Sequence, residues 1–114
     1  MAGNLPDYPA PPGNKRWTVA TITGPASYTQ ITTGTPPTGG QIVKASDIGL
    51  VDLDYVHAGI SDNGQYLAIP IFENNPQRAT SRVLIIWLTA ATGAQVAGAT
   101  NLSARTFRLS AFGN

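Results

Sequence analysis

The residue types that can perform chemistry are sparse in this sequence, and their densest group lies at residues 52–57. Asp52 and Asp54 stand two positions apart in a predicted strand, so we expect their carboxylates on one face, about 7 Å apart along it. Paired carboxylates suit the binding of a hard cation or acid–base catalysis. Because no neighbouring residues supply further oxygen ligands in a recognised spacing, we interpret the pair as a solvated strand face.

The single histidine, His57, follows Asp54 by three positions. In a strand this spacing points it away from the two acids, to the side of Val51, Leu53 and Tyr55, unless a bulge intervenes. A catalytic zinc site needs three protein ligands, and the chain has one imidazole and no thiol. No G-x-S-x-G elbow is present either. We therefore interpret His57 as a core or interface residue and predict no catalytic, metal or cofactor site.

The composition narrows the function classes further. Charged residues make up 11% of the 114 residues, against a typical ~25%, while the hydrophobic share is 42% and the net charge is +1. This balance disfavours a coiled coil and a basic nucleic-acid binder, and the absence of cysteine excludes a disulfide framework. The longest apolar run, residues 83–88, has the length of a strand rather than of a membrane span, and residues 1–14 lack the features of a signal peptide. We expect one domain that binds neither nucleic acid nor membrane.

Residues 1–14 differ from the rest of the chain because they contain four prolines and two glycines. Proline fixes φ and removes a backbone donor, so this segment is expected to be an extended arm that cannot pair as a central strand. Two interpretations stay open: a disordered tail, or an arm that docks on a neighbouring subunit. The candidate contacts of a docking arm are Leu5, Tyr8, Pro9, Pro11 and Pro12.

Residues 15–114 show the pattern of strands and turns. We expect seven or eight short strands, at residues 17–23, 26–31, 41–43, 51–60, 65–73, 82–89 and 106–112, with a further turn into residues 94–97. Residues 46–49 predict a helical turn, and Asn63-Gly64 predicts a hairpin. Pro70 indicates an edge strand or a bulge. This pattern predicts an all-β fold: a small antiparallel β-sandwich or barrel, jelly-roll-like or immunoglobulin-like, preceded by the arm.

Two predicted strands indicate which faces of the sheet are buried, one in the core and one against a second subunit. Residues 106–112 alternate, with Phe107, Leu109 and Ala111 on the expected core face. Residues 82–89 are apolar on both faces, so both faces should be covered, and a small β domain covers only one with its own core. We therefore predict a homo-oligomer contact on this strand, through Val83, Ile85 and Trp87.

Several turn and strand phrases resemble small virion proteins of tailed bacteriophages. They are residues 24–29 (GPASYT), residues 42–50 with their SDIGL turn, residues 91–96 (ATGAQV) and residues 101–109 (NLSARTFRL). The resemblance spans residues 17–113 in order and spacing, whereas the arm and the loop at residues 32–40 are longer than in that pattern. It implies a head decoration (cement) protein on the capsid surface of a virion, made in the host cytoplasm and commonly trimeric. Its partners would be the major capsid protein and other copies of itself, and it carries over no catalytic residue.

Three other functions stay open. The first is a tail, neck or fibre-associated virion component, which copy number per particle would distinguish from a cement protein. The second is a carbohydrate-binding β-sandwich, which would expose tryptophan or tyrosine rings in a coplanar strip. The third, and weakest, is a small hydrolase built around His57 and Asp54.

Overall fold

The computed structural model describes residues 15–32, 37–73 and 80–114, and these form an antiparallel β domain. Its elements are β1 (Arg16–Thr23), β2 (Gln41–Lys44), the 3₁₀ turn η3 (Ala45–Ile48), β3 (Leu53–Ser61), β4 (Tyr66–Ile71), β5 (Arg82–Thr89) and β6 (Thr106–Gly113). The all-β prediction is confirmed, with six strands in the described residues rather than seven or eight. The predicted arm contacts Leu5, Tyr8, Pro9, Pro11 and Pro12 lie outside the described residues.

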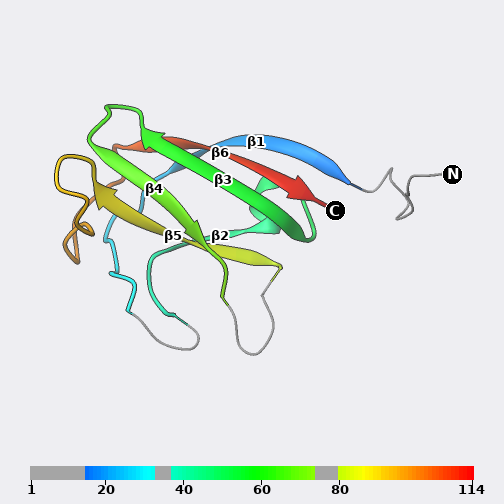
Figure 1. The fold of residues 1–114 in the computed structure, drawn as a ribbon, viewed down its shortest axis with the longest axis horizontal. Helices are drawn as coiled ribbons and strands as arrows, with labels where there is room; N and C mark the ends of the chain where they lie inside the picture. The colour runs from blue at the N-terminus through cyan, green and yellow to red at the C-terminus, as the bar shows by residue number, and fades with distance from the viewer. Residues whose placement is uncertain (1–14, 33–36, 74–79) are drawn as a thin grey trace, which may run out of the picture.

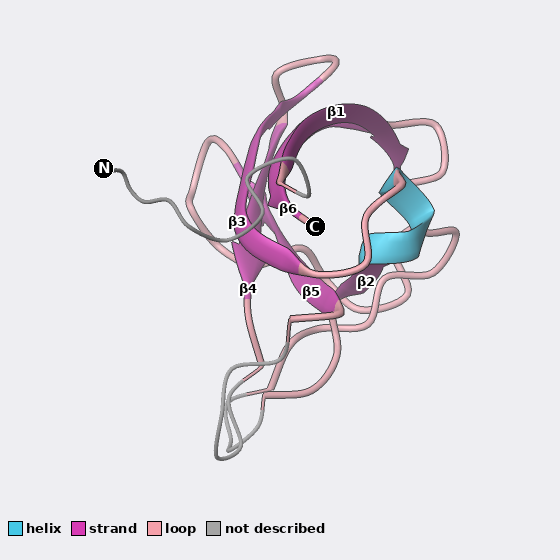
Figure 2. Cartoon of the chain, turned by 90° about the vertical axis from the view of Figure 1, so that its right-hand side faces the viewer, coloured by secondary structure: helices cyan, strands magenta, loops and turns pink. Residues whose placement is uncertain are grey.

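The six strands form one sheet in the order β1-β6-β3-β4-β5-β2 (Figure 1). Seen along the strands, the sheet curls into a half-barrel, and η3 lies between the edge strands β1 and β2 (Figure 2). Two hydrogen bonds between described residues span this gap. The Arg16 guanidinium donates to the Gly49 carbonyl after η3, and Gln41 Nε2 donates to the Thr23 carbonyl at 2.7 Å. The sandwich-or-barrel alternative is thus resolved as an incompletely closed barrel.

Strand β3 forms the corner of the half-barrel because it pairs with β6 along most of its length and with β4 near its end. Its register with β6 shifts twice, between Leu53 and Tyr55 and between Ala58 and Ser61, and each shift inserts one extra residue. A β-bulge of this kind bends a strand and reverses which side chains face inward. Leu53 is 0% exposed whereas Tyr55 is 51% exposed, so the expectation that these two share a face is wrong.

The hairpin predicted at Asn63-Gly64 and the edge or bulge predicted at Pro70 have different outcomes. The Asn63-Gly64 turn joins β3 to β4 as predicted, with Gly64 at φ 75° and Asn63 Oδ1 accepting from Ser61 Oγ at 2.8 Å. Pro70 was predicted to mark an edge strand or a bulge, but β4 is interior in the strand order and its register with β5 runs through Pro70 without a shift. The proline is tolerated because β4 is in register with β3 only at Leu67, so β3 requires no backbone donor from Pro70.

The core fills the inside of the curled sheet around Trp87. The Trp87 ring meets the edges of Tyr66 and Phe107 at centroid distances of 5.8 and 5.4 Å. The predicted core face of β6 is confirmed, since Phe107, Leu109 and Ala111 are all buried. Val83, Ile85 and Trp87 are each 0% exposed and belong to this core, which corrects their assignment to a subunit contact. The alternation of β5 turns these three inward, so a second subunit would meet the other face of the strand.

Residues 26–31, predicted as a strand, instead form a bend that inserts Tyr28 into the core. The Tyr28 hydroxyl accepts a hydrogen bond from the Trp87 backbone N–H at 3.1 Å and donates to Gln95 Oε1 at 2.8 Å. Gln95 Oε1 also accepts from the Ile31 N–H at 2.6 Å, which anchors the bend to the segment after β5. Burial raises the pKa of Tyr28 above its ordinary 10.0, opposed by the hydrogen bond from Trp87.

Replacing Gln41 by alanine should destabilise the half-barrel. Gln41 Oε1 accepts the indole N–H of the buried Trp87 at 2.9 Å, and its Nε2 bonds the Thr23 carbonyl across the gap between the edge strands. Leaving a buried donor unpaired costs about 1–3 kcal/mol, so Gln41→Ala should lower the free energy of unfolding by that amount in urea denaturation. The control, Ser46→Ala on the exposed surface of η3, should change it by less than about 0.5 kcal/mol. Equal effects of the two variants would contradict this role of Gln41.

The stability contributed by Tyr28 should decline at high pH. Because the folded-state pKa of Tyr28 is raised, the unfolded chain releases this proton first as the pH passes 10.0. The contribution is therefore complete below that pH and is lost as the pH rises towards the folded-state pKa. Urea denaturation from about pH 8 to about pH 11 should show the stability gap between wild type and Tyr28→Phe shrinking. Tyr55→Phe, at an exposed ring, is the matched control; a constant gap for Tyr28→Phe would contradict the prediction.

Candidate docking surface

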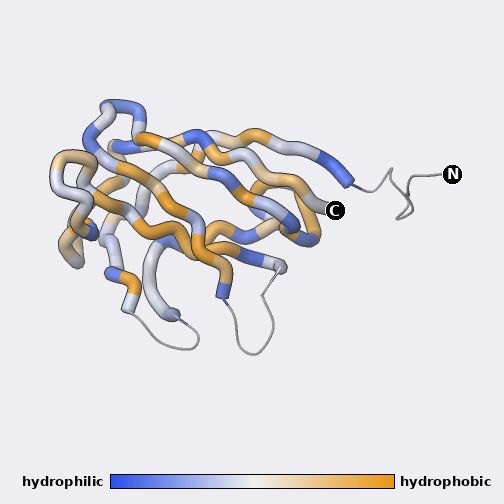
Figure 3. Tube along the Cα trace, viewed as in Figure 1, coloured by the Kyte–Doolittle hydropathy of each residue, from blue (hydrophilic) through white to orange (hydrophobic). Residues whose placement is uncertain are grey.

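The outer face of the half-barrel carries a stripe of aliphatic side chains along β4 and β5. Register pairs of these strands share a face, and three such pairs point away from the core. This aliphatic stripe consists of Leu67 with Leu88, Ile69 with Ile86, and Ile71 with Leu84. Ile69 is 40% exposed, Leu84 is buried, and the others are half-buried. The hydrophobic colouring of Figure 3 follows both strands.

A second apolar group on the same face lies where β1, β6 and β3 run together. Trp17 and Tyr55 are both in register with Phe112, which places the three rings side by side. Trp17 meets Phe112 at a centroid distance of 5.2 Å and Tyr55 at 6.2 Å, and it remains 64% exposed. The rings of this aromatic cluster are inclined at 50° and 75° to one another, which is not the coplanar strip expected for stacking on a sugar.

A shallow hollow of about 320 Å³ lies further along β1, β6 and β3, the strands that carry the aromatic cluster, and is lined in part by Val19, His57, Gly59, Arg108 and Ser110. Gly59 lies within the second bulge of β3, and a Cβ added there would meet nothing within 4 Å. The missing side chain therefore opens the hollow. No ion pair or hydrogen bond of the His57 or Arg108 side chain is found among the described residues.

The residues singled out for chemistry are separated from one another. Asp52 Oδ1 accepts from the Thr80 hydroxyl at 3.2 Å, while Asp54 Oδ2 pairs with Lys15 Nζ at 2.5 Å. The first bulge turns His57 to the outer face beside Tyr55, where it is exposed, so of the two interpretations from the sequence the core position is wrong and the interface position stays a prediction. Ser110 is in register with His57, yet no hydrogen bond joins their side chains. Among the described residues, no three of the potential metal-ligating types come together.

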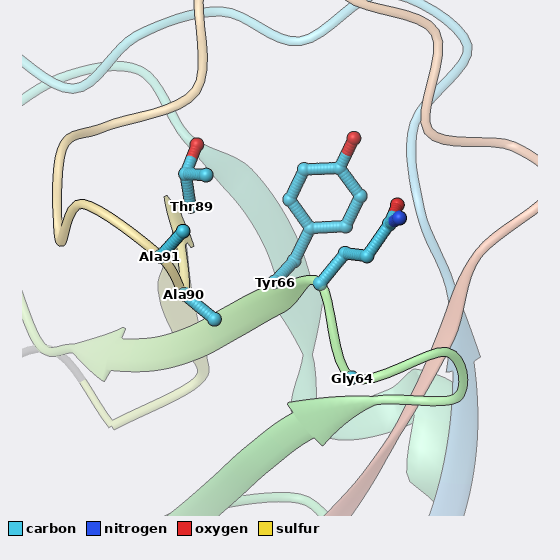
Figure 4. A pocket seen from close by; sticks show the side chains of 6 residues that line it. Gly64, Tyr66, Thr89, Ala90 and Ala91 are labelled. Atoms are coloured by element: carbon cyan, nitrogen blue, oxygen red, sulfur yellow. The ribbon is translucent and has the colours of Figure 1, made fainter.

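Another pocket, of about 560 Å³, lies between the start of β4 and the end of β5 (Figure 4). Figure 4 shows the side chains of Tyr66 and Thr89 rising on the same side of it, with Ala90, Ala91 and Gly64 at its rim. All six lining residues are uncharged, and none of them is an aspartate, a glutamate or a histidine that could act as an acid or a base. This pocket offers shape and two hydroxyl groups but no residue arrangement typical of catalysis.

Comparisons with protein-family models, with curated protein sequences and with solved structures find no match to this chain. In the described part of the chain, no helix has the length and apolar character needed to cross a membrane. The candidate site therefore rests on the geometry of the outer face.

Part of this face could have been found from the sequence. The alternation of residues 67, 69 and 71 is visible there, and an inward assignment of residues 83, 85 and 87 implies an outward Leu84, Ile86 and Leu88. The aromatic cluster and the hollow could not, because both depend on the two bulges in β3. A bulge changes the register by one residue and leaves little signal in composition.

Neighbouring residues of β5 give a direct test of the two faces. Ile85 is 0% exposed and points into the core, while Ile86 lies on the aliphatic stripe. Ile85→Lys buries a charge without a partner and should lower the free energy of unfolding by more than about 3 kcal/mol, or abolish folding. Ile86→Lys should cost about 1 kcal/mol and keep the native circular dichroism spectrum. Equal losses in urea denaturation would show that the assignment of faces is incorrect.

Proposed function

We propose that this chain is a non-enzymatic structural protein that binds other proteins through the outer face of its half-barrel. The observation that carries the proposal is the aliphatic stripe together with the aromatic cluster, which expose Ile69, Tyr55 and Trp17 at 40%, 51% and 64%. Scattered exposed hydrophobic residues are ordinary, but apolar groups gathered on one face indicate an interaction surface. The convex outer face of a half-barrel suits a broad protein partner better than a small substrate, because small molecules bind in concave pockets.

The most specific form of this function is a decoration protein on the head of a tailed bacteriophage, which binds the outer surface of the major capsid lattice. This part of the proposal comes from the resemblance in the sequence. Each of the four phrases that carry it contributes a buried residue, and these include Tyr28, Ile48, Val96 and Leu102. The phrases therefore describe how the domain is built, while the outer face indicates how it acts.

A decoration protein stabilises a shell by adding contacts at each junction between shell subunits. An interface of about 800 Å² per partner is the usual scale for a specific contact. Contacts of this size repeated around a closed shell reinforce one another, because each bound copy restrains several neighbours. A trimer would suit junctions where three shell units meet, and this role requires no reactive centre.

Quantitative mass spectrometry of purified particles of a virus that encodes the protein tests the location. A decoration protein should be present in a copy number comparable with that of the shell subunit, whereas a tail or neck component should be present in a few copies. Absence from particles would overturn the virion assignment.

A charged substitution on the outer face should abolish attachment without unfolding the domain. In Ile69→Glu/Ile86→Glu, two carboxylates replace apolar contacts at the centre of the aliphatic stripe. We expect binding to stripped shells, measured by co-sedimentation, to weaken by at least about tenfold with an unchanged circular dichroism spectrum. Ser46→Glu, on η3, is the control and should bind as the wild type. Undiminished binding by the double variant would show that another surface is used.

A further inference from the structure

The hollow at Gly59 has the composition of a site for a carboxylate. Arg108 and His57 flank it on a face that is otherwise mostly apolar or uncharged, with Val19 and Ile60 beside them. A guanidinium presents paired N–H donors that match a carboxylate, and arginine is the residue most often used for this purpose at interfaces. An arginine without a partner on an apolar face is costly to bury, so its partner group should arrive with the molecule that covers it.

The acidic residues of the described chain are engaged elsewhere. Asp54 pairs with Lys15, Asp62 with Arg105 at 3.7 Å, and Glu73 with Arg82 at 2.6 Å. Asp47 accepts from the Lys44 backbone N–H, and Asp52 accepts from Thr80. The chain has six acidic residues, so the sixth, Asp7, is the one outside the described part.

Asp7 has neighbours that suit the hollow. It stands between Leu5-Pro6 and Tyr8-Pro9, so the sequence presents one carboxylate between two apolar pairs. The receiving face presents one guanidinium, Arg108 on β6, between Val19 on β1 and Ile60 on β3. The order apolar–acid–apolar therefore matches the order apolar–cation–apolar, and prolines lower the entropy lost when such a segment binds.

We propose that the arm, residues 1–14, of one copy docks over β1, β6 and β3 on the outer face of a second copy, beside the aliphatic stripe, and places the Asp7 carboxylate in the hollow beside Arg108 and His57. The geometry favours a second copy. Asp7 precedes Lys15 by eight residues, about 25 Å in an extended chain at ~3.1 Å per residue. Arg108 of the same copy is in register with Thr21, beyond the start of β1, so the arm would have to reverse over its own strand to reach it.

An arm that binds a different surface on the next copy forms a heterologous contact, and such contacts close into a ring where the rotation between copies closes and otherwise extend as an open filament. This inference rests on the proposed function in that it assigns the arm and the hollow to self-assembly. The virion role and the docking of the arm can fail separately. Absence of the protein from virus particles would overturn the virion role and leave the docking of the arm intact. Self-association that does not depend on Arg108 would overturn the docking of the arm and leave the virion role intact.

A charge exchange in the full-length chain tests the pairing by sedimentation velocity. Arg108→Glu should weaken self-association by about tenfold or more, because it sets two carboxylates against each other. Asp7→Arg should weaken it similarly, and the double variant Asp7→Arg/Arg108→Glu should recover to within about threefold of wild type. Lys44→Glu, on β2 at the other edge of the sheet from β1, makes the same change in net charge as Arg108→Glu and should leave association unchanged.

A steric variant provides a second test that does not depend on charge. Gly59→Val fills the hollow, and the site is open enough for the added side chain. It should weaken self-association by about tenfold while the melting temperature of the domain stays near that of wild type. A wild-type chain that is monomeric, an oligomer insensitive to Arg108→Glu and Gly59→Val, or a double variant that does not recover would each overturn the proposal. So would a monomer whose binding to shells depends on Arg108, since the carboxylate would then belong to another protein.

Discussion

The structure depends on which face of β5 enters the barrel. Both faces of this strand are apolar, and the curled sheet can bury only one of them against its own core. Trp87 decides the choice because both of its N–H groups are bonded inside, the backbone group to the Tyr28 hydroxyl and the indole group to Gln41. Turning β5 over would leave both donors unpaired and expose the largest side chain of the core. With Trp87 inside, Ile86 and Leu88 must lie outside.

The corner strand β3 determines which side chains face outward in the other half of the sheet. Its first bulge turns Tyr55 outward to join Trp17 and Phe112, and its second bulge places Gly59 where a side chain would otherwise fill the surface. The bulges serve the fold first, since a sheet of six strands curls this tightly only where a strand can bend. The aromatic cluster and the hollow are therefore produced by the same backbone distortions that close the core.

The sequence predicted the elements better than their surroundings. Strand β6 and the Asn63-Gly64 hairpin followed from local pattern, because alternation and turn chemistry act within a few residues. Residues 26–31 have the composition of a strand, yet Tyr28 is held in a bend by hydrogen bonds to Trp87 and Gln95, more than fifty residues away in the chain. The inward direction of Trp87 depends on Gln41 in the same way. Contacts between residues so far apart leave no pattern in a short stretch of sequence. For that reason the face of β5 with Val83, Ile85 and Trp87 was predicted to contact a second subunit, whereas it packs in the core of its own chain.

The distribution of charge leaves the middle of the outer face mostly apolar. The three ion pairs within the described part of the chain lie at or near the ends of strands: Lys15 with Asp54, Arg82 with Glu73, and Arg105 with Asp62. The middle of the face is thus left with few charges to desolvate, and covering its apolar groups is favourable with almost any apolar partner. Such a surface gives affinity without discrimination. In the proposed docking, Arg108, which forms no ion pair with any described residue, supplies the discrimination, because a partner that covers it without a matching acid must bury an uncompensated charge.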